Sequence, residues 1–568
     1  MWKATLALAL YVGCSDNTGT PVDGGLPDGG GDGGITVDAA ETSGCYEFGR
    51  WPAPTTTVTI PYSAKNAEGG LYYTDIQAAF PQTDWSTVDR LYIEAGQYAY
   101  IWIGNLPDRT AEDPLVITNK GGQVHIGPAP SAAFGYLWVM DGGSNWVLTG
   151  RYDPISQTGD EGFQGHRCGA YAHSQGTYGF VSDDEMMNLH TTHNHMGLNV
   201  SADAFELEWM EIRRSSYAGI RISKDDVTVA SGDPPPSPFT DVTVHDMYIH
   251  DTGGEGLYFG MTSGSPYLHA SFVRLHLYNN RILRTANEVA QLQHLASGSR
   301  IHNNVFAWGG MQWRDAFAEH QDNGSQHVFR TGDVEIRHNI YLRGMESLLN
   351  FFGAPEPGDA SGTVTLDENY FSDAMWLGIY FGGPGKTAET AINYSFTGNV
   401  FRNLDPTETY GYFAAPYYTA RMPSTTLLTI GTNWMAPISF VGNTWSGSRT
   451  LAFGSPAYLT QSNNTSGGAV EAVEFVNTGL PAGTDHRALE FWTAKTGTWA
   501  GNNPVTYAAG TMVFDEGRMY RALTATSAGD PAPSTSLNGT WEDLGAPADD
   551  VRLVRGSPYE GRGLLDRP

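Results

Sequence analysis

The frame of asparagine, any residue and large apolar residue recurs along the middle of the chain, at Asn280-Arg281-Ile282, Asn304-Val305-Phe306, Asn339-Ile340-Tyr341, Asn369-Tyr370-Phe371, Asn399-Val400-Phe401 and Asn443-Thr444-Trp445. The intervals between successive asparagines are 24, 35, 30, 30 and 44 residues. Periods in this range, some lengthened by loop insertions, are typical of solenoid proteins, which stack one structural unit per repeat. We also predict that Asp246-Met247-Tyr248 is an earlier repeat, with aspartate in the asparagine place.

Short alternating strands precede several of these positions, as in Val334-Glu335-Ile336 and Val364-Thr365-Leu366. Asparagine tolerates the left-handed backbone that a sharp bend between strands requires. Its amide groups, stacked on successive coils, can also hydrogen-bond to one another. No amphipathic helical pattern of any length interrupts the run of strands and Gly, Asn and Asp turns. We therefore predict an all-β chain whose main domain is a parallel β-helix.

The charge balance limits the partners of this protein. The chain of 568 residues has 61 Asp and Glu against 32 Lys and Arg, a formal net charge of −29. Such an excess of negative charge argues against binding to nucleic acid or to an anionic membrane surface. A polyanionic ligand would have to be met by local arginine or lysine residues, or by a bound cation. We expect a monomer.

The first residues are predicted to be a processing signal. Lys3 precedes a short apolar run, and Tyr11-Val12-Gly13-Cys14 resembles the lipobox of bacterial lipoproteins. This resemblance implies lipid on Cys14 and an outer-membrane or extracellular location, whereas an ordinary signal peptide is the alternative. The Gly, Asp and Pro residues of 15–44 cannot form a core, so this segment is predicted to be a tether. Cys45 and Cys168 then remain, either as one disulfide or as two free thiols.

The domain organisation follows from changes in composition. We predict a signal peptide at 1–14, a tether at 15–44, a β-helix at 45–486, a small module at 487–547 and a tail at 548–568 that closes the β-helix. The module carries Trp499, Tyr520 and Trp541, and it resembles the chitin- and cellulose-binding modules of bacterial chitinases. The resemblance implies aromatic rings that stack on sugar faces, while the alternative is that these rings form the core of the module.

Acidic residues stand at the entrance of several strands. Glu255 and Glu288 lie 9 and 8 residues after their ladder positions, and either Asp315 or Asn323 is the counterpart in the next coil. Neighbouring coils lie about 4.8 Å apart. Stacked carboxylates at this spacing would either share a proton as a glycosidase pair or bind a cation such as calcium. The alternative is an acidic turn on a solvated edge.

The insertion at 307–332 mixes aromatic residues with charges of both signs, which suits an oligosaccharide cleft. Together with nearby residues it supplies our remaining candidates. Candidate catalytic residues are His294, His320 and Lys224 beside the acidic set, and candidate substrate-binding residues are Arg221, Tyr258, Trp313 and Arg330. A surface role without chemistry is the alternative for Lys224.

The stretch from Leu91 to Gly353 resembles the pectate lyase-like superfamily of exported right-handed parallel β-helix proteins. The resemblance is carried by Ala95-Gly96-Gln97-Tyr98, by Ala111-Glu112-Asp113-Pro114-Leu115-Val116-Ile117 and by His250-Asp251-Thr252-Gly253-Gly254-Glu255-Gly256-Leu257-Tyr258-Phe259-Gly260. It implies a polysaccharide lyase or hydrolase, although no complete catalytic signature of either is present. We favour a lyase that acts on a uronate-containing glycan. The alternatives are a hydrolase that uses the Glu and Asp column, and a non-catalytic glycan-binding surface protein.

Overall fold

The structure is a computed structural model and describes residues 53–130, 135–150, 178–185, 195–262, 267–314, 319–320, 323–344, 347–351, 361–374, 377–382, 392–404, 426–431, 434, 436–447, 450–454, 456–492, 507–527 and 529–565. Strands dominate this part of the chain, and its one α-helix, α1 (Ile76–Ala79), has four residues. The 3-10 helices are η2 (Tyr62–Ala64), η3 (Trp85–Thr87), η5 (Val229–Ser231), η7 (Pro456–Tyr458) and η8 (His486–Ala488). No described helix has the length and apolar character needed to cross a membrane.

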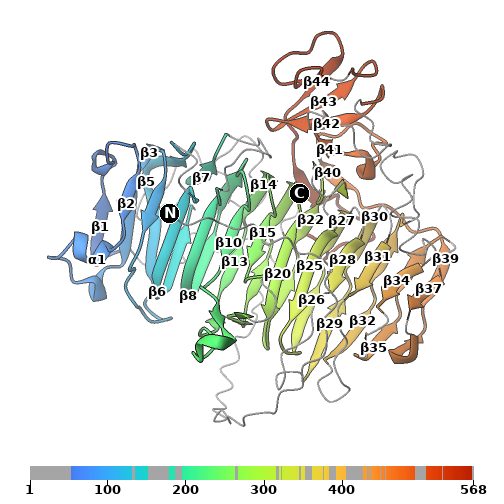
Figure 1. The fold of residues 1–568 in the computed structure, drawn as a ribbon, viewed down its shortest axis with the longest axis horizontal. Coiled ribbons are helices and arrows are strands. Elements are labelled where there is room, and N and C mark those ends of the chain that lie inside the picture. The colour runs from blue at the N-terminus through green and yellow to red at the C-terminus, as the bar shows by residue number, and fades with distance from the viewer. Residues whose placement is uncertain are drawn as a thin grey trace.

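Thirty-five strands hydrogen-bond into a parallel β-helix, which confirms the predicted fold (Figure 1). Each coil supplies one strand to each of three stacks, as β13 (Thr243–His245), β14 (Tyr248–Thr252) and β15 (Leu257–Phe259) illustrate. In the next coil these strands pair in parallel with β18 (His276–Tyr278), β19 (Arg281–Thr285) and β20 (Ala290–Leu295). We name the stacks after β13, β14 and β15.

The remaining members of the stacks follow in chain order. The β13 stack continues with β21 (Arg300–His302), β26 (Val334–Arg337), β29 (Thr363–Asp367), β32 (Asn393–Thr397), β35 (Ile438–Val441) and β38 (Leu459–Ser462), and begins at β1 (Thr57–Ile60). The β14 stack includes β7 (Phe180–Asp183), β9 (Met210–Arg213), β22 (Val305–Ala307), β27 (Ile340–Gly344), β30 (Tyr370–Ala374), β33 (Val400–Arg402), β36 (Thr444–Ser446) and β39 (Thr465–Gly468). The β15 stack includes β2 (Leu71–Tyr73), β4 (Ile101–Ile103), β10 (Ile220–Ile222), β25 (Asn323–Phe329), β28 (Ser347–Phe351), β31 (Leu377–Phe381), β34 (Thr426–Ile430) and β37 (Thr450–Gly454). Four long strands turn a corner and join two stacks: β3 (Arg90–Tyr98), β5 (Leu115–Ile126), β6 (Trp138–Thr149) and β8 (Leu198–Glu208).

The asparagine ladder forms as predicted between the β13 and β14 stacks. Asn280 Nδ2 donates to Asn304 Oδ1 at 2.9 Å, and Asn304 Nδ2 donates to Asn339 Oδ1 at 3.0 Å. The same bond links each later pair, and Asn464 adds a seventh member that the sequence frame missed. The Nδ2 of every ladder asparagine from Asn280 to Asn443 also donates to a backbone carbonyl of the preceding coil. The ladder therefore satisfies the polar groups of this buried corner.

Two details of the predicted ladder are wrong. The backbone N–H of Met247 donates to Asn280 Oδ1, so Met247 and not Asp246 occupies the ladder position of the preceding coil. The left-handed residue is also the one before each ladder asparagine, as at Asn279 (φ 52°) and Asn303 (φ 54°). Asp246 (φ 52°) aligns with Asn279. The ladder asparagine thus provides hydrogen bonds, and its predecessor provides the bend.

The apolar residue of the repeated frame points into the β-helix. Phe306, Tyr341, Phe371 and Phe401 stack on one another with ring centroids 5.0, 4.9 and 4.9 Å apart. All four side chains are buried. One repeated frame therefore encodes both the ladder at the corner and an aromatic column in the core.

The outer face of the β14 stack is covered by the C-terminal segments. A separate four-stranded sheet, made of β41 (Glu490–Phe491), β42 (Met512–Asp515), β43 (Arg518–Ala522) and β44 (Trp541–Gly545), stands beside this face (Figure 1). In its described residues the tail adds no strand to the β-helix, because β45 (Asp550–Leu553) pairs antiparallel with β40 (Phe475–Asn477) in a separate two-stranded sheet. Instead the tail runs across several coils, where the N–H of Gly563 donates to the His338 carbonyl at 2.7 Å.

A buried charge network fixes this tail to the β14 stack. Arg284 on β19 donates to both carboxylate oxygens of Asp549, at 2.6 and 2.7 Å, and to Asp251 at 2.8 Å. Tyr248 on β14 also donates to Asp549. Arg284, Asp251 and Asp549 are all buried. The outer face of β14 and β19 is therefore an internal interface. The β13 and β15 stacks offer the other outer faces on which a ligand could bind.

Candidate functional site on the outer face of the β15 stack

The middle residues of successive strands form an outward row on the β15 stack. Strand alternation buries Ile220 and Ile222 and turns Arg221 outward. The parallel register then aligns Asn199 on β8, Arg221 on β10, Tyr258 on β15, Gln291 on β20 and Gln326 on β25. This row of polar and aromatic groups crosses consecutive coils and suits an elongated ligand that lies along the solenoid axis.

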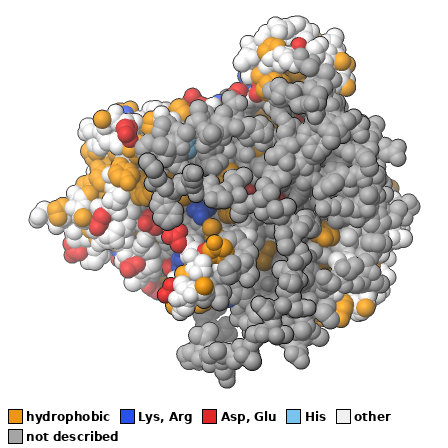
Figure 2. Space-filling model, viewed as in Figure 1, with side chains coloured by type: hydrophobic (Ala, Val, Ile, Leu, Met, Phe, Trp, Pro, Cys, Tyr) orange, Lys and Arg blue, Asp and Glu red, His pale blue; other side chains and the backbone are white. Residues whose placement is uncertain are grey.

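Aromatic residues extend this row toward the N-terminal coils, which the sequence analysis missed. Tyr72 on β2 pairs with Trp102 on β4, and their rings lie 5.7 Å apart. Trp102 contacts Tyr136 at 6.3 Å, and the Tyr136 hydroxyl lies 3.5 Å from Arg221 Nη1. Tyr72 is 53% exposed. Hydrophobic side chains also gather over β2 and β3 at the left of Figure 2. The sequence signal for these two residues was an aromatic residue at the middle of a short strand, in Leu71-Tyr72-Tyr73 and in Ile101-Trp102-Ile103.

Arg221 is a partly buried guanidinium at the centre of the row. Its Nη1 donates to Asn199 Oδ1 at 3.1 Å, and its Nη2 lies 3.1 Å from Met261 Sδ. Within the described part of the chain, Arg221 has no carboxylate partner among its hydrogen bonds and ion pairs. Other arginines do pair with acids, as Arg274 in the bend before β18 does with Asp241 and Arg300 on β21 does with Glu335. In a chain of net charge −29, this leaves Arg221 available to an anionic group.

Tyr258 and His294 meet Arg221 around Met261 and Thr262. The Tyr258 hydroxyl lies 2.8 Å from Thr262 Oγ1, and burial raises the pKa of this phenol. His294 Nε2 lies 3.0 Å from the Met261 carbonyl oxygen, so Nε2 carries the proton and Nδ1 holds a lone pair. Burial, followed by the charge of His269, lowers the pKa of His294 to about 4. At neutral pH the site therefore combines a cation, a neutral imidazole and a protonated phenol.

Lys224 lies beside this group but is held in place. Its Nζ donates to Asp203 Oδ1 at 2.8 Å and to the Ser237 carbonyl at 3.0 Å. The ammonium, which follows β10, therefore links Asp203 within β8 to the segment at Ser237. These contacts give Lys224 a structural role. Because its ammonium is already bonded to Asp203, Lys224 is a weaker candidate for the catalytic base than the sequence suggested.

Glu255 and Glu288 occupy adjacent coils at the other end of the strands. Leu257 pairs with Ala290, and Ala290 pairs with Ser325, so Asn323 is the third member of the column. Both glutamates are buried, and Asn287 Nδ2 donates to Glu255 Oε1 at 2.9 Å. The predicted carboxylate pair thus exists on neighbouring coils, about 4.8 Å apart by strand spacing, but both side chains are buried.

The insertion contributes a hairpin in which β23 (Trp313–Arg314) pairs antiparallel with β24 (Glu319–His320), so that Trp313 aligns with His320. Asp315 lies outside the described residues, and the register gives its expected place in the acidic column to Asn323. Arg330, after β25, donates to the carbonyl oxygen of His269 at 3.4 Å. It therefore lies on the same side of the stack as His294.

Two of the module aromatics predicted to contact sugar, Tyr520 and Trp541, are buried in the described part of the module. Tyr520 and Trp541 are each 3% exposed, and Trp541 packs edge-on against Tyr507 at 5.7 Å. With Tyr507 they form part of the core of this unit, as the alternative expected, and sugar binding by the module stays a prediction. Trp499, like Cys14, Cys45 and Cys168, lies outside the described residues.

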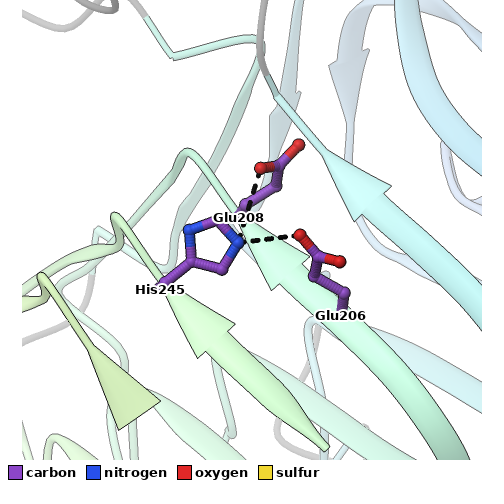
Figure 3. A group of neighbouring side chains, drawn as sticks. All are labelled: Glu206, Glu208 and His245. Carbon is purple, nitrogen blue, oxygen red and sulfur yellow. Dashed lines mark hydrogen bonds and ion pairs between the residues drawn. The ribbon is translucent and has the colours of Figure 1, made fainter. Parts of the chain in front are cut away.

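A second cluster, which the sequence analysis missed, lies on the β13 stack. His245 Nε2 lies 2.8 Å from Glu206 Oε1 and 3.5 Å from Glu208 Oε2. Figure 3 shows the imidazole facing both carboxylates. Burial disfavours the charged imidazole, but hydrogen bonds to Asp246 and Glu206 outweigh it and raise the pKa of His245 to about 10. The available signal was the pair of glutamates two residues apart, since such residues share one side of a strand.

Comparisons with known proteins add similarity of fold only. No known protein-family model matches this chain, and no curated protein matches its sequence. The chain is similar to pectate lyase Pel9A with a TM-score of 0.36 and 10% identity, covering 75% of this chain and 83% of that one. It is similar to the catalytic unit of a GH87 alpha-1,3-glucanase from Streptomyces thermodiastaticus with a TM-score of 0.32 and 12% identity, covering 73% of this chain and 70% of that one. It is similar to the Streptococcus pneumoniae surface protein and adhesin PfbA with a TM-score of 0.29 and 12% identity, covering 72% and 97%. These scores are low, so the β-helix assignment depends on the strand pairing itself.

Proposed function

We propose that this protein is an exported β-helix enzyme that cleaves an acidic polysaccharide on the outer face of the β15 stack, with a lyase reaction favoured over hydrolysis. The single observation that carries this proposal is Arg221, a cation without a carboxylate partner among its contacts in the described part of a chain of net charge −29. Aromatic residues beside it offer apolar faces to neighbouring sugars. Export and a lipid tether on Cys14 belong to the same proposal.

A β-elimination would use these groups as follows. Arg221 pairs with the uronate carboxylate and makes the adjacent C–H proton more acidic. His294 Nδ1, which is neutral at neutral pH, accepts that proton. The electron pair forms a C=C bond while the glycosidic C–O bond breaks, and Tyr258 supplies a proton to the leaving oxygen. Burial keeps Tyr258 protonated, which suits an acid rather than a base.

Hydrolysis by Glu255 and Glu288 is the second candidate. Their position on adjacent coils is near the spacing of about 5 Å expected of a retaining glycosidase pair. Burial of both side chains disfavours it, because a catalytic carboxylate must reach the scissile bond. Calcium binding by the same pair is also disfavoured without substrate, since calcium takes about six to eight oxygen ligands and one carboxylate already accepts from Asn287.

The test measures binding separately from cleavage. Affinity electrophoresis of the purified protein through gels that contain a polyuronate or a neutral glucan would report recognition of the anionic group. We expect Arg221→Ala to weaken polyuronate retardation by about 10- to 100-fold, the cost of losing a hydrogen bond to a charged group. Arg300→Ala is the matched control, because Arg300 is also a strand arginine but lies on the β13 stack. Equal retardation of both variants would refute the role of Arg221.

A further inference from the structure

We propose that Glu206, Glu208 and His245 bind one divalent transition-metal ion, of the zinc or manganese class, on the β13 stack. This site lies on a different face from Arg221, so it does not depend on the proposed function. The three candidate ligand atoms lie within 4.8 Å of one another. They combine one imidazole nitrogen with two carboxylate oxygens, and the structure holds them together through the β-helix backbone itself (Figure 3).

The register of two consecutive coils creates this arrangement. Glu206 and Glu208 lie two residues apart on β8, so their side chains leave the same side of the strand. Strand β13 pairs with β8 in parallel, with Thr243 opposite Glu206 and His245 opposite Glu208. His245 therefore projects between the two carboxylates from the next coil.

The distances suit a shared ion. Ligand atoms bound at about 2.0 to 2.2 Å to one tetrahedral or octahedral ion lie roughly 3 to 3.5 Å apart. The Nε2 of His245 is 2.8 Å from Glu206 Oε1 and 3.5 Å from Glu208 Oε2, which brackets this range. A small rotation of the Glu206 side chain, which is 14% exposed, would adjust the shorter distance.

The groups behind the imidazole orient it as a metal ligand. His245 Nδ1 lies 2.5 Å from Asp246 Oδ2 and donates to it, so Nε2 faces the two glutamates, where a metal ion would displace the proton that Nε2 shares with Glu206. Asn279 in turn donates to the other oxygen of Asp246. The ring of Tyr278 stacks on His245 at 4.6 Å and an angle of 4°. A carboxylate behind a ligating histidine is the usual support of a metal site, because it fixes both the tautomer and the ring plane.

The ligand types select the class of metal. Calcium prefers six to eight oxygen ligands, whereas zinc and manganese accept a mixture of imidazole and carboxylate. Three carboxylates surround one imidazole here, counting Asp246. A divalent cation would offset this concentration of negative charge and would link β8 to β13. We therefore expect a structural ion that joins two coils.

The test uses the full chain after removal of metals with a chelator. Isothermal titration with zinc, manganese and calcium, together with thermal unfolding, should show one zinc or manganese ion per chain, a raised Tm and no comparable binding of calcium. Glu206→Gln should weaken zinc binding by at least about 10-fold while the metal-free Tm stays close to that of the parent. Glu335→Gln is the control, since Glu335 is an exposed acid on the same stack.

The contrary outcomes are equally specific. Zinc binding that Glu206→Gln and His245→Asn leave unchanged would place the ion elsewhere and overturn the proposal. A parent protein that binds neither zinc nor manganese would also overturn it. His245→Asn serves here as a second variant, and its circular dichroism spectrum would show whether it is folded.

Discussion

Replacing Asp549 by Asn should release the C-terminal tail from the β14 stack. Asp549 accepts two hydrogen bonds from Arg284, at 2.6 and 2.7 Å, and both side chains are buried. Removing one partner of a buried ion pair costs about 3 to 5 kcal/mol, because the remaining charge stays desolvated. Asp251 still pairs with Arg284 at 2.8 Å, so we expect the lower end of this range, about 3 kcal/mol.

Hydrogen exchange measures this change where it occurs. If tail opening governs exchange of the β45 amides, a loss of about 3 kcal/mol raises their exchange rate by roughly 100-fold. Amides in the core of the β-helix should keep their protection. Mass spectrometry of peptides that contain Asp550–Leu553 would report the two regions separately in one sample.

The control is an arginine–aspartate pair of the same geometry on the surface. Arg274 donates to both oxygens of Asp241 at 2.6 Å, but these side chains are 54% and 49% exposed. Exposed pairs contribute about 0 to 1 kcal/mol, so Asp241→Asn should change exchange by less than about 5-fold. Equal exchange of β45 in the Asp549 and Asp241 variants would refute the claim that the buried network holds the tail.

Two further predictions concern the ladder and a buried carboxyl group. Asn339→Ala removes the acceptor of Asn304 and the donor to Asn369 and to the Ile301 carbonyl. Each buried group left unpaired costs about 1 to 3 kcal/mol, so we expect the free energy of unfolding to fall by at least about 3 kcal/mol. Asn464→Ala, at the end of the ladder, should cost about 1 kcal/mol, and urea unfolding of both variants would compare the two losses. Burial raises the pKa of Glu490 from 4.5 to about 8, so the folded state holds a proton there that the unfolded state has lost, and stability should fall as pH rises through this window. Glu490→Gln should flatten that part of the Tm profile and raise Tm at pH values above about 8; an unchanged slope would contradict the shift.

The fold could be predicted from the sequence because one three-residue frame encodes two stacked columns. Asn339 and Tyr341, for example, supply a ladder amide and a core ring within one turn of the chain. Asp246 was misplaced by one position because aspartate, like asparagine, tolerates the left-handed bend, and Asp246 fills the bend position rather than the ladder position. Only the partner strand distinguishes the two, through the hydrogen bond from Met247 to Asn280.

The candidate site could be predicted in part, where simple alternation decides which side chain faces outward. Alternation is enough for Arg221 and Tyr258, which are neighbours on paired strands. It fails for contacts that need a register across insertions, as for His245 with Glu206, which are 39 residues apart. Alternation also fails where another segment covers a strand, as the tail covers Arg284. It fails again in the small module, where Tyr520 and Trp541 are buried in the core.

The most direct test of the central claim is an assay of the purified protein on a panel of polyuronates and neutral glycans. Ultraviolet absorbance of unsaturated uronate and the release of reducing ends would be followed in parallel. Our account predicts that both signals rise together on at least one polyuronate, and that both fall in Arg221→Ala but not in Arg300→Ala. Reducing ends without unsaturated uronate would indicate hydrolysis through Glu255 and Glu288. The absence of both signals on every glycan, from protein that still binds a polyuronate, would contradict catalysis and leave a binding protein.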